Sequence, residues 1–153
     1  MWKTLISLVV AAAVIGGCAE PPDELTPYLT QLGQMQKYNE QLSRYEVYLG
    51  NPGLERQARD VREIIQAYKD DMDKFGGTKD KFIKAGHNSV KRALERGLKQ
   101  IVEPDFPTFT ISASKQIRNI RKQVELHFEH LNKLWTEAGK TEPFPLKWPS
   151  SGD

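Results

Sequence analysis

Four stretches of the chain place apolar residues alternately three and four positions apart, which is the period of an amphipathic α-helix. They cover about residues 27–49, 54–75, 78–102 and 112–138. Clusters of glycine, asparagine or proline separate them, and no stretch shows the period of two that is typical of a strand. The pattern therefore predicts an all-α protein of four helices with short connections.

The same stripes predict which residues form the core. The second stretch keeps the alternation without exception, through Leu54, Ala58, Val61, Ile65, Tyr68, Met72 and Phe75. In the first stretch Asn39 and Glu46 interrupt the stripe, and the neighbouring Tyr38 and Tyr45 are expected to fill the gaps. One face of each helix is therefore expected to be buried.

Residues at the ends of the stretches fit helix termini. Thr26 and Thr78 are expected to cap the first and third helices, because a threonine hydroxyl can accept a bond from an unpaired N–H of the first turn. Gly139 is expected to end the fourth helix in a left-handed conformation. Four helices of similar length favour an antiparallel up-down-up-down bundle, with a three-helix or extended coiled-coil arrangement as the alternative.

Composition narrows the class of protein. The chain has 153 residues, enough for one domain, and its 27% charged and 39% hydrophobic residues exclude collagen-like and fully disordered proteins. A single cysteine rules out an internal disulfide. The sequence has no haem-attachment motif, Gly-rich phosphate loop, His-Glu-x-x-His or nucleophile elbow. We therefore expect no enzyme activity and no cofactor.

The first eighteen residues have the layout of an export signal. Lys3 gives a basic start, an apolar run covers residues 5–15, and two glycines precede the lone Cys18. An apolar run of this length is too short to span a bilayer. The segment Ile15-Gly16-Gly17-Cys18 resembles the lipobox of bacterial lipoproteins. The alternative is that Cys18 is a buried thiol of an ordinary transmembrane helix.

The resemblance implies that Cys18 is acylated and that two or more acyl chains hold the mature chain on a membrane. Ala19, where Asp would favour the inner membrane, implies the outer membrane of a bacterial envelope, facing the periplasm. The expected organisation has four parts: a removed signal peptide (1–17), a lipidated cysteine and tether (18–26), a helical bundle (27–139) and an extended tail (140–153).

Positive charge is concentrated in the second half of the chain. Lysine and arginine exceed aspartate and glutamate by five over residues 78–102 and by two over residues 111–139. If the third and fourth helices are antiparallel neighbours, six cations form one basic patch: Arg92, Arg96, Lys99, Lys115, Arg118 and Lys122. Lipid phosphate or an acidic protein would gain roughly 1 kcal/mol per cation there. The alternative is a solvated face, and the expected export argues against nucleic acid.

Two histidines, His87 and His127, occupy stripe positions where aliphatic residues are usual. In antiparallel neighbouring helices they lie at similar depth, where two imidazoles can hold a metal or a non-covalent haem. The alternative, which we favour, is that each is a core histidine without metal, hydrogen-bonded to Tyr38, Asn39 or Asn88.

The C-terminal residues 142–149 contain three prolines and cannot form a helix, although Phe144 and Trp148 are strongly apolar. This tail either packs back along a groove of the helices, which we favour, or binds a partner through Phe144 and Trp148 as an extended strand. Together with the anchor and the basic patch, it favours an adaptor or structural protein of the envelope, with a metal- or haem-binding bundle as the alternative.

Overall fold

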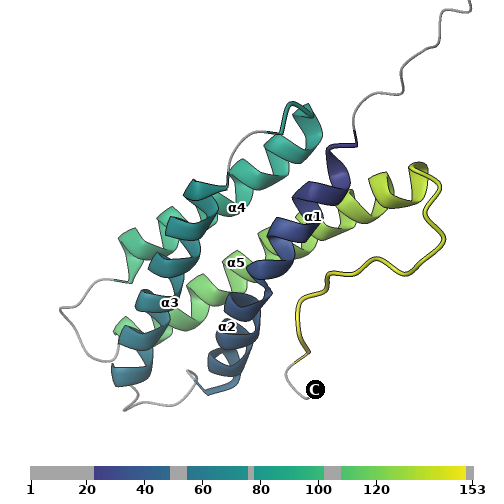
Figure 1. The fold of residues 1–153 in the computed structure, drawn as a ribbon. Helices are drawn as coiled ribbons and strands as arrows, with labels where there is room; N and C mark the ends of the chain where they lie inside the picture. The colour runs from purple at the N-terminus through teal and green to yellow at the C-terminus, as the bar shows by residue number, and fades with distance from the viewer. Residues whose placement is uncertain (1–22, 49–54, 76–77, 102–107, 151–153) are drawn as a thin grey trace, which may run out of the picture.

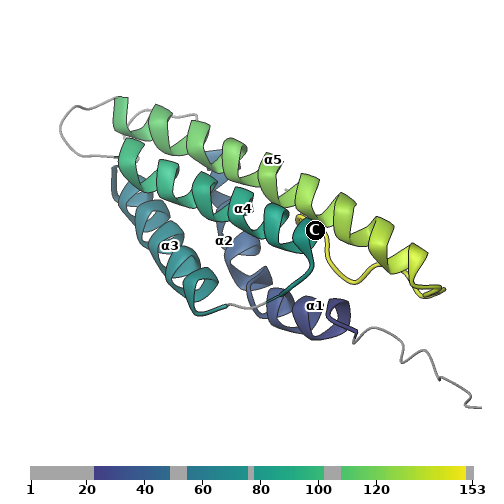
Figure 2. The ribbon, with the colours of Figure 1, turned by 90° about the horizontal axis from the view of Figure 1, so that it is seen from above.

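The computed structural model describes residues 23–48, 55–75, 78–101 and 108–150, which contain five α-helices and no strand. The helices are α1 (Leu25–Gln34), α2 (Gln36–Tyr48), α3 (Glu55–Lys74), α4 (Lys81–Gln100) and α5 (Thr108–Glu137). They pack against one another (Figure 1), and α4 and α5 lie side by side and run in opposite directions (Figure 2). The prediction of an all-α protein is confirmed. No helix in the described ranges has the length and apolar character needed to cross a bilayer.

The first predicted helix is divided into α1 and α2 at Met35. The N–H of Met35 bonds to the carbonyl of Leu32 (3.0 Å), and the N–H of Tyr38 bonds to the carbonyl of Met35 (2.9 Å). These bonds reach three residues back, so one tight turn replaces the regular helical ladder. The chain changes direction between α1 and α2 (Figure 2). The prediction of a single helix over residues 27–49 is therefore wrong, although Met35 stays buried.

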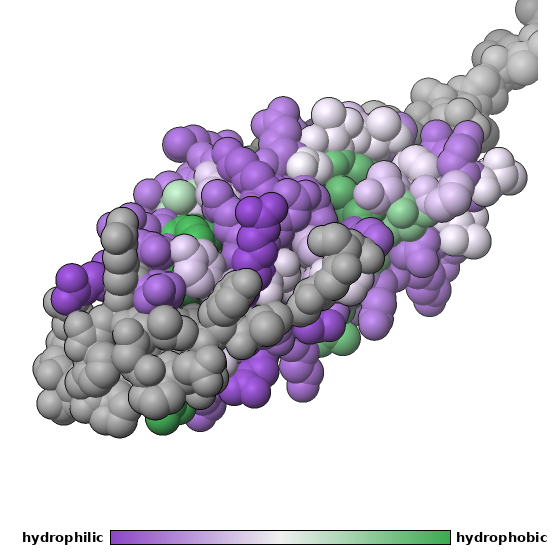
Figure 3. Space-filling view, turned by 90° about the horizontal axis from the view of Figure 1, so that it is seen from below, coloured by the Kyte–Doolittle hydropathy of each residue, from purple (hydrophilic) through white to green (hydrophobic). Residues whose placement is uncertain are grey.

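The predicted stripes form the core. The members of the α3 stripe within the described residues are all buried: Ala58, Val61, Ile65, Tyr68, Met72 and Phe75. Tyr38 fills the gap beside Asn39 as expected, because its ring stacks on Tyr68 at 5.1 Å. Seen from below, most of the described surface is hydrophilic, with apolar atoms in small areas between polar ones (Figure 3).

Local hydrogen bonds define the start of α1 and the end of α5. Oδ1 of Asp23 accepts the N–H groups of Leu25 (3.0 Å) and Thr26 (3.1 Å), so α1 begins at Leu25 and Thr26 is not its cap. Gly139 follows the end of α5 with φ +74°, and its N–H bonds to the carbonyl of Thr136 (3.0 Å). This left-handed glycine confirms the predicted end of the last helix.

Glu24 connects the start of α1 to the start of α4. Its Oε2 accepts the Thr78 hydroxyl (2.8 Å) and the N–H groups of Lys79 (2.7 Å) and Asp80 (3.0 Å). Asp80, and not Thr78, is the N-cap of α4, since its carboxylate accepts two N–H groups of the first turn. Thr78 was expected to be the cap, but its hydroxyl is engaged with Glu24 instead.

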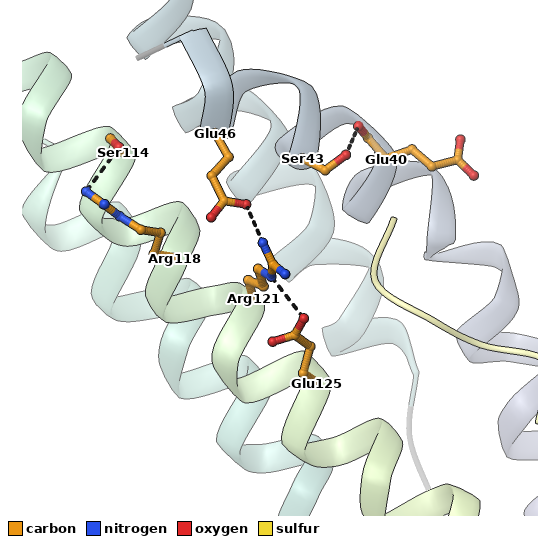
Figure 4. A network of polar contacts seen from close by, with 7 residues as sticks. All are labelled: Glu40, Ser43, Glu46, Ser114, Arg118, Arg121 and Glu125. Atoms are coloured by element: carbon orange, nitrogen blue, oxygen red, sulfur yellow. Dashed lines mark hydrogen bonds and ion pairs between the residues drawn. The ribbon is translucent and has the colours of Figure 1, made fainter. Parts of the chain in front are cut away.

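Ion pairs join α2 to α5. Arg121 donates from Nη1 to Glu46 of α2 (3.3 Å) and from Nε to Glu125 one turn further along α5 (2.9 Å; Figure 4). The Glu46 side chain is only 15% exposed. A charge that interrupts the predicted stripe of the first stretch is therefore tolerated because a cation meets it at the edge of the core.

The C-terminal tail folds back onto the helices. The indole Nε1 of Trp135 donates to the carbonyl of Glu142 (2.8 Å), and the amide of Gln36 donates to the carbonyl of Lys147 (2.6 Å). Phe144 lies with its ring centroid 6.5 Å from that of Trp135. The tail is thus held by α5 at one end and by α2 at the other.

The stripes predict a large difference between two neighbouring substitutions in α3. Ile65 has no exposed surface, so Ile65→Asp buries an unpaired charge and is expected to lower the free energy of unfolding by about 3–5 kcal/mol. Asp70 is exposed and only accepts a bond from Gln66, so Asp70→Ala is expected to change it by about 0.5 kcal/mol or less. Urea denaturation measures both, and equal midpoints would contradict the assignment of faces.

Candidate functional site

Three side chains from three helices meet at the hydroxyl of Tyr28. Its Oη lies 2.6 Å from Nε2 of His127 in α5 and 3.3 Å from Nδ1 of His87 in α4. The ring of Phe75 closes the cluster, with centroids 5.0 Å from Tyr28 and 5.2 Å from His87. Each of these residues is at most 8% exposed. The structure therefore brings the two predicted histidines together inside the core.

Tyr28 is not among the partners expected from the sequence, which were Tyr38, Asn39 and Asn88. It lies at a stripe position of the first stretch, and a buried phenol needs a polar partner, so its position gave a signal. The signal was too weak to use because nothing local in the sequence indicates which of several tyrosines reaches the histidines.

One assignment of protons gives a hydrogen-bond partner to most of the polar atoms in this cluster. A backbone hydrogen bond with Met72 favours a proton on the His87 ring. Because Nδ1 is the ring atom beside Tyr28, we assign the proton to Nε2 and Nδ1 as the acceptor of the Tyr28 hydroxyl. The Tyr28 oxygen then accepts the N–H of His127 Nε2. Nδ1 of His127 is left as a buried acceptor without a hydrogen-bond partner in the described residues.

Burial keeps these groups neutral. It lowers the pKa of His127 to about 4, with smaller contributions from the nearby His87 and His130. It also lowers the pKa of His87, which Lys91 lowers further, and it raises the pKa of the Tyr28 phenol. At neutral pH the cluster is therefore a chain of uncharged hydrogen-bonding groups.

The ring of His127 lies directly against the backbone of α4 at Gly86. A Cβ atom at Gly86 would lie 2.0 Å from His127 Nδ1 and 2.6 Å from its Cε1, which is closer than non-bonded atoms can approach. Gly97 of the same helix, which is buried, differs: a Cβ there would meet Ile120 and Ile65 at an ordinary 3.5 Å. Gly86 is therefore required by His127, and Gly97 is not required by its neighbours.

The cluster separates two depressions of the surface. One, of about 420 Å³, lies beside Tyr28 and His87 between α1, α3 and α4. The other is a groove of about 440 Å³ between α4 and α5, with His127 among its lining residues and Phe82 and Leu126 along it. Both have the volume of small-ligand sites.

The position of Tyr28 bears on the metal- or haem-binding alternative. A zinc ion bound by both histidines would sit about 2.0–2.1 Å from each ligating nitrogen. The Tyr28 hydroxyl already lies between Nδ1 of His87 and Nε2 of His127, and its raised pKa opposes ionisation to a phenolate ligand. Within the described ranges, no three His, Cys, Asp or Glu side chains are grouped as a metal site. The geometry therefore favours a hydrogen-bonded core cluster.

All six cations of the predicted basic patch are exposed, and none forms an ion pair with the described part of the chain. The side chains of Gln100 and Gln116 bond at 2.5 Å, which places the end of α4 beside the start of α5. Arg118 differs from the other five. It donates to Ser114 (3.4 Å) on the side of α5 that carries Arg121 and faces α2 (Figure 4).

The two aromatic residues of the tail are used within the molecule. Trp148 is 7% exposed, and Phe144 is half-buried against Phe128 and Trp135. Of the two arrangements weighed for the tail, the structure has the one in which it packs back on the helices. Binding of a partner through Phe144 and Trp148 stays a prediction.

Cys18 and the whole predicted signal lie outside the described residues. Comparison with known protein families, curated proteins and solved structures gives no match. Function is therefore inferred from the sequence features and the geometry alone.

The contact of His127 with Gly86 predicts opposite effects for two substitutions in one helix. Gly86→Ala is expected to lower the free energy of unfolding by at least about 2 kcal/mol, because the ring or the helix must move. Gly97→Ala is expected to raise it by up to about 1 kcal/mol, since alanine is the better helix former. Thermal denaturation of both variants, and of Gly86→Ala combined with His127→Ala, measures this. Failure of the second substitution to relieve Gly86→Ala would contradict the contact.

The lowered pKa of His127 predicts a loss of stability in acid. Between its ordinary value of 6.5 and about 4, the unfolded chain binds a proton that the folded chain does not. The contribution of neutral His127 to the free energy of unfolding is therefore complete at neutral pH. It is lost as the pH falls through this window, which lowers the free energy of unfolding by about 3 kcal/mol. Urea denaturation from pH 7 to 4 measures it. His127→Gln should flatten the dependence, and the control His130→Gln, an exposed residue of the same helix, should not.

Proposed function

We propose that the protein is a lipid-anchored component of a bacterial envelope, acting as a helical adaptor or structural component with a basic face for an anionic partner. Its mature chain would begin at Cys18 and lie on the outer membrane, facing the periplasm. The lipobox-like segment Ile15-Gly16-Gly17-Cys18 and the following Ala19 support this location. We propose no enzyme activity, because the histidine cluster is neutral, buried and engaged with Tyr28.

The observation that carries the proposed basic face is the contrast between paired and unpaired cations. Asp71 and Asp73 of α3 each meet two lysines, which are Lys37, Lys74, Lys69 and Lys91. The six cations of the basic patch have no such partner in the described ranges. Exposed cations that have no acidic partner among the described residues are candidates for an anionic partner, each contributing about 1 kcal/mol near a charged membrane surface.

The proposed architecture is an antiparallel four-helix bundle in which α1 and α2 together form the first arm. The opposite directions of α4 and α5 support it (Figure 2). The core residues contributed by both α1 and α2 support it as well. A rigid helical body of this kind suits a scaffold better than a catalyst, since its only buried histidines hold helices together.

The anchor is tested through Cys18. Expression with labelled palmitate in a Gram-negative host is expected to label the wild-type chain and place it in the membrane fraction. Cys18→Ser should abolish the label and leave an unprocessed or soluble chain, because the serine hydroxyl does not replace the acylated thiol. Ala19→Ser is the matched control, since it changes the neighbouring residue and leaves the thiol. Equal labelling of the wild type and Cys18→Ser would contradict the anchor.

A further inference from the structure

The large hydrophobic residues that are exposed in the described part of the chain all belong to α4 and α5. They are Phe82 (76% exposed), Ile111 (63%) and Leu126 (41%). A single exposed apolar residue is ordinary. These three lie on the two helices that also carry the basic patch, and α1, α2 and α3 contribute none among the side chains whose exposure the structure describes.

Helical spacing places two of the exposed apolar residues and two cations of the basic patch on one face of α5. Along α5, Ile111, Lys115, Lys122 and Leu126 follow one another at intervals of four, seven and four positions, which is one stripe of a helix. The buried residues Ala113, Ile117 and Val124 lie on the opposite side of α5, so this stripe faces away from the core. We define the outer face by eight residues: Phe82, Arg92, Arg96, Lys99, Ile111, Lys115, Lys122 and Leu126.

Apolar and cationic parts of the outer face meet at the groove between α4 and α5. Phe82, Leu126 and Ser89 line this groove. Nη2 of Arg92 lies 3.4 Å from the hydroxyl of Ser89, which places a guanidinium at the groove. A surface with cations beside protruding apolar side chains matches the boundary of a bilayer, where phosphates lie next to acyl chains.

The start of α1 is fixed close to this face. Glu24 accepts hydrogen bonds from Lys79 and Asp80, and Phe82 follows two residues later. Cys18 precedes Asp23 by five positions, and an extended chain of that length spans at most about 18 Å. An acyl group on Cys18 would therefore hold the Phe82 end of the outer face close to a bilayer.

We propose that the outer face lies on the surface of a bilayer that contains anionic phospholipid, with Phe82, Ile111 and Leu126 inserted among the lipids. This rests on the proposed anchor, which makes docking of the outer face an intramolecular step at high effective concentration. The cations Arg92, Arg96, Lys99, Lys115 and Lys122 then lie at the level of the lipid phosphates. The bundle rests lengthwise on the membrane that anchors it.

The test uses the acylated protein in vesicles and reads which face touches the lipid. Because the one native thiol is acylated, a new cysteine takes a fluorophore selectively. Ala85→Cys places it on α4 beside the groove, and Gln41→Cys places it on an exposed position of α2, behind α4 and α5. With brominated lipids in vesicles of phosphatidylcholine and phosphatidylglycerol, quenching is expected to be several-fold stronger at residue 85 than at residue 41.

Substitutions then separate charge from apolar insertion. Arg96→Gln with Lys122→Gln is expected to lower the ratio of docked to undocked protein about 30-fold, from roughly 1 kcal/mol per cation. Lys37→Gln with Lys74→Gln makes the same change in net charge on α2 and α3 and should leave the ratio unchanged. Phe82→Ser should lower it about tenfold. Arg96, Lys122 and Phe82 are exposed, so their variants should keep the wild-type melting temperature. Lys37→Gln with Lys74→Gln removes two surface ion pairs with Asp71 and should lower the melting temperature only slightly, because exposed ion pairs contribute little to stability.

Equal quenching at the two positions, equal quenching in vesicles of phosphatidylcholine alone, or no effect of Phe82→Ser would each overturn the proposal. Palmitate labelling of Cys18 is measured separately. Labelled protein without face-selective quenching overturns the docking and leaves the anchor in place. If Cys18 carries no label, the anchor fails, and the same two fluorophores are read with the chain added to the phosphatidylglycerol vesicles from solution. Selective quenching there supports the face, and its absence overturns it.

Discussion

The placement of the His127 ring against the bare backbone of Gly86 is the contact on which the arrangement of the helices depends. It fixes how closely α5 approaches α4, because any side chain at position 86 would occupy the place of the ring. The other edge of the ring bonds to Tyr28, which brings α1 onto the same pair. His87 extends the chain of hydrogen bonds to Tyr28 and contacts Phe75 at the end of α3. Buried polar groups that bond to one another tolerate few alternative packings, so this cluster favours one.

The parts of the structure that follow from a repeating pattern were predictable, and the parts that follow from single contacts were not. The stripe of α3 was predictable because every member obeys one period. The break at Met35 was not, because the apolar stripe continues through it and no proline marks it, and a single glycine, Gly33, does not by itself end a helix. Asp80 and Thr78 are both residues that cap helices, and the choice between them depends on Glu24, more than fifty residues away. In the same way, the histidines could be placed at one depth, but their partner Tyr28 is 59 and 99 residues distant.

The buried histidines and the exposed cations have separate roles in the structure. The histidines face inward, lose their charge and hold helices together. The cations of the outer face point outward and have no acidic partner in the described ranges, whereas α3 pairs its carboxylates with lysines from three helices. A body built this way can be altered on its surface without disturbing its centre. The proposed binding could therefore be tested by substitutions that leave folding unchanged.

The separation in sequence between α1 and its partners has a consequence for how the molecule is made. The hydroxyl of Tyr28 finds its acceptors 59 and 99 residues later, and Gln36 reaches a carbonyl of the tail 111 residues later. Contacts between residues so far apart in the sequence form late in folding, because the intervening chain must first be brought together. Of the five described helices, α1 is synthesised first and is therefore expected to dock among the last. Until α5 has been synthesised, α1 lacks part of the surface against which it packs. The hydrophobic core of the nascent chain is therefore expected to stay incomplete until α5 has been made.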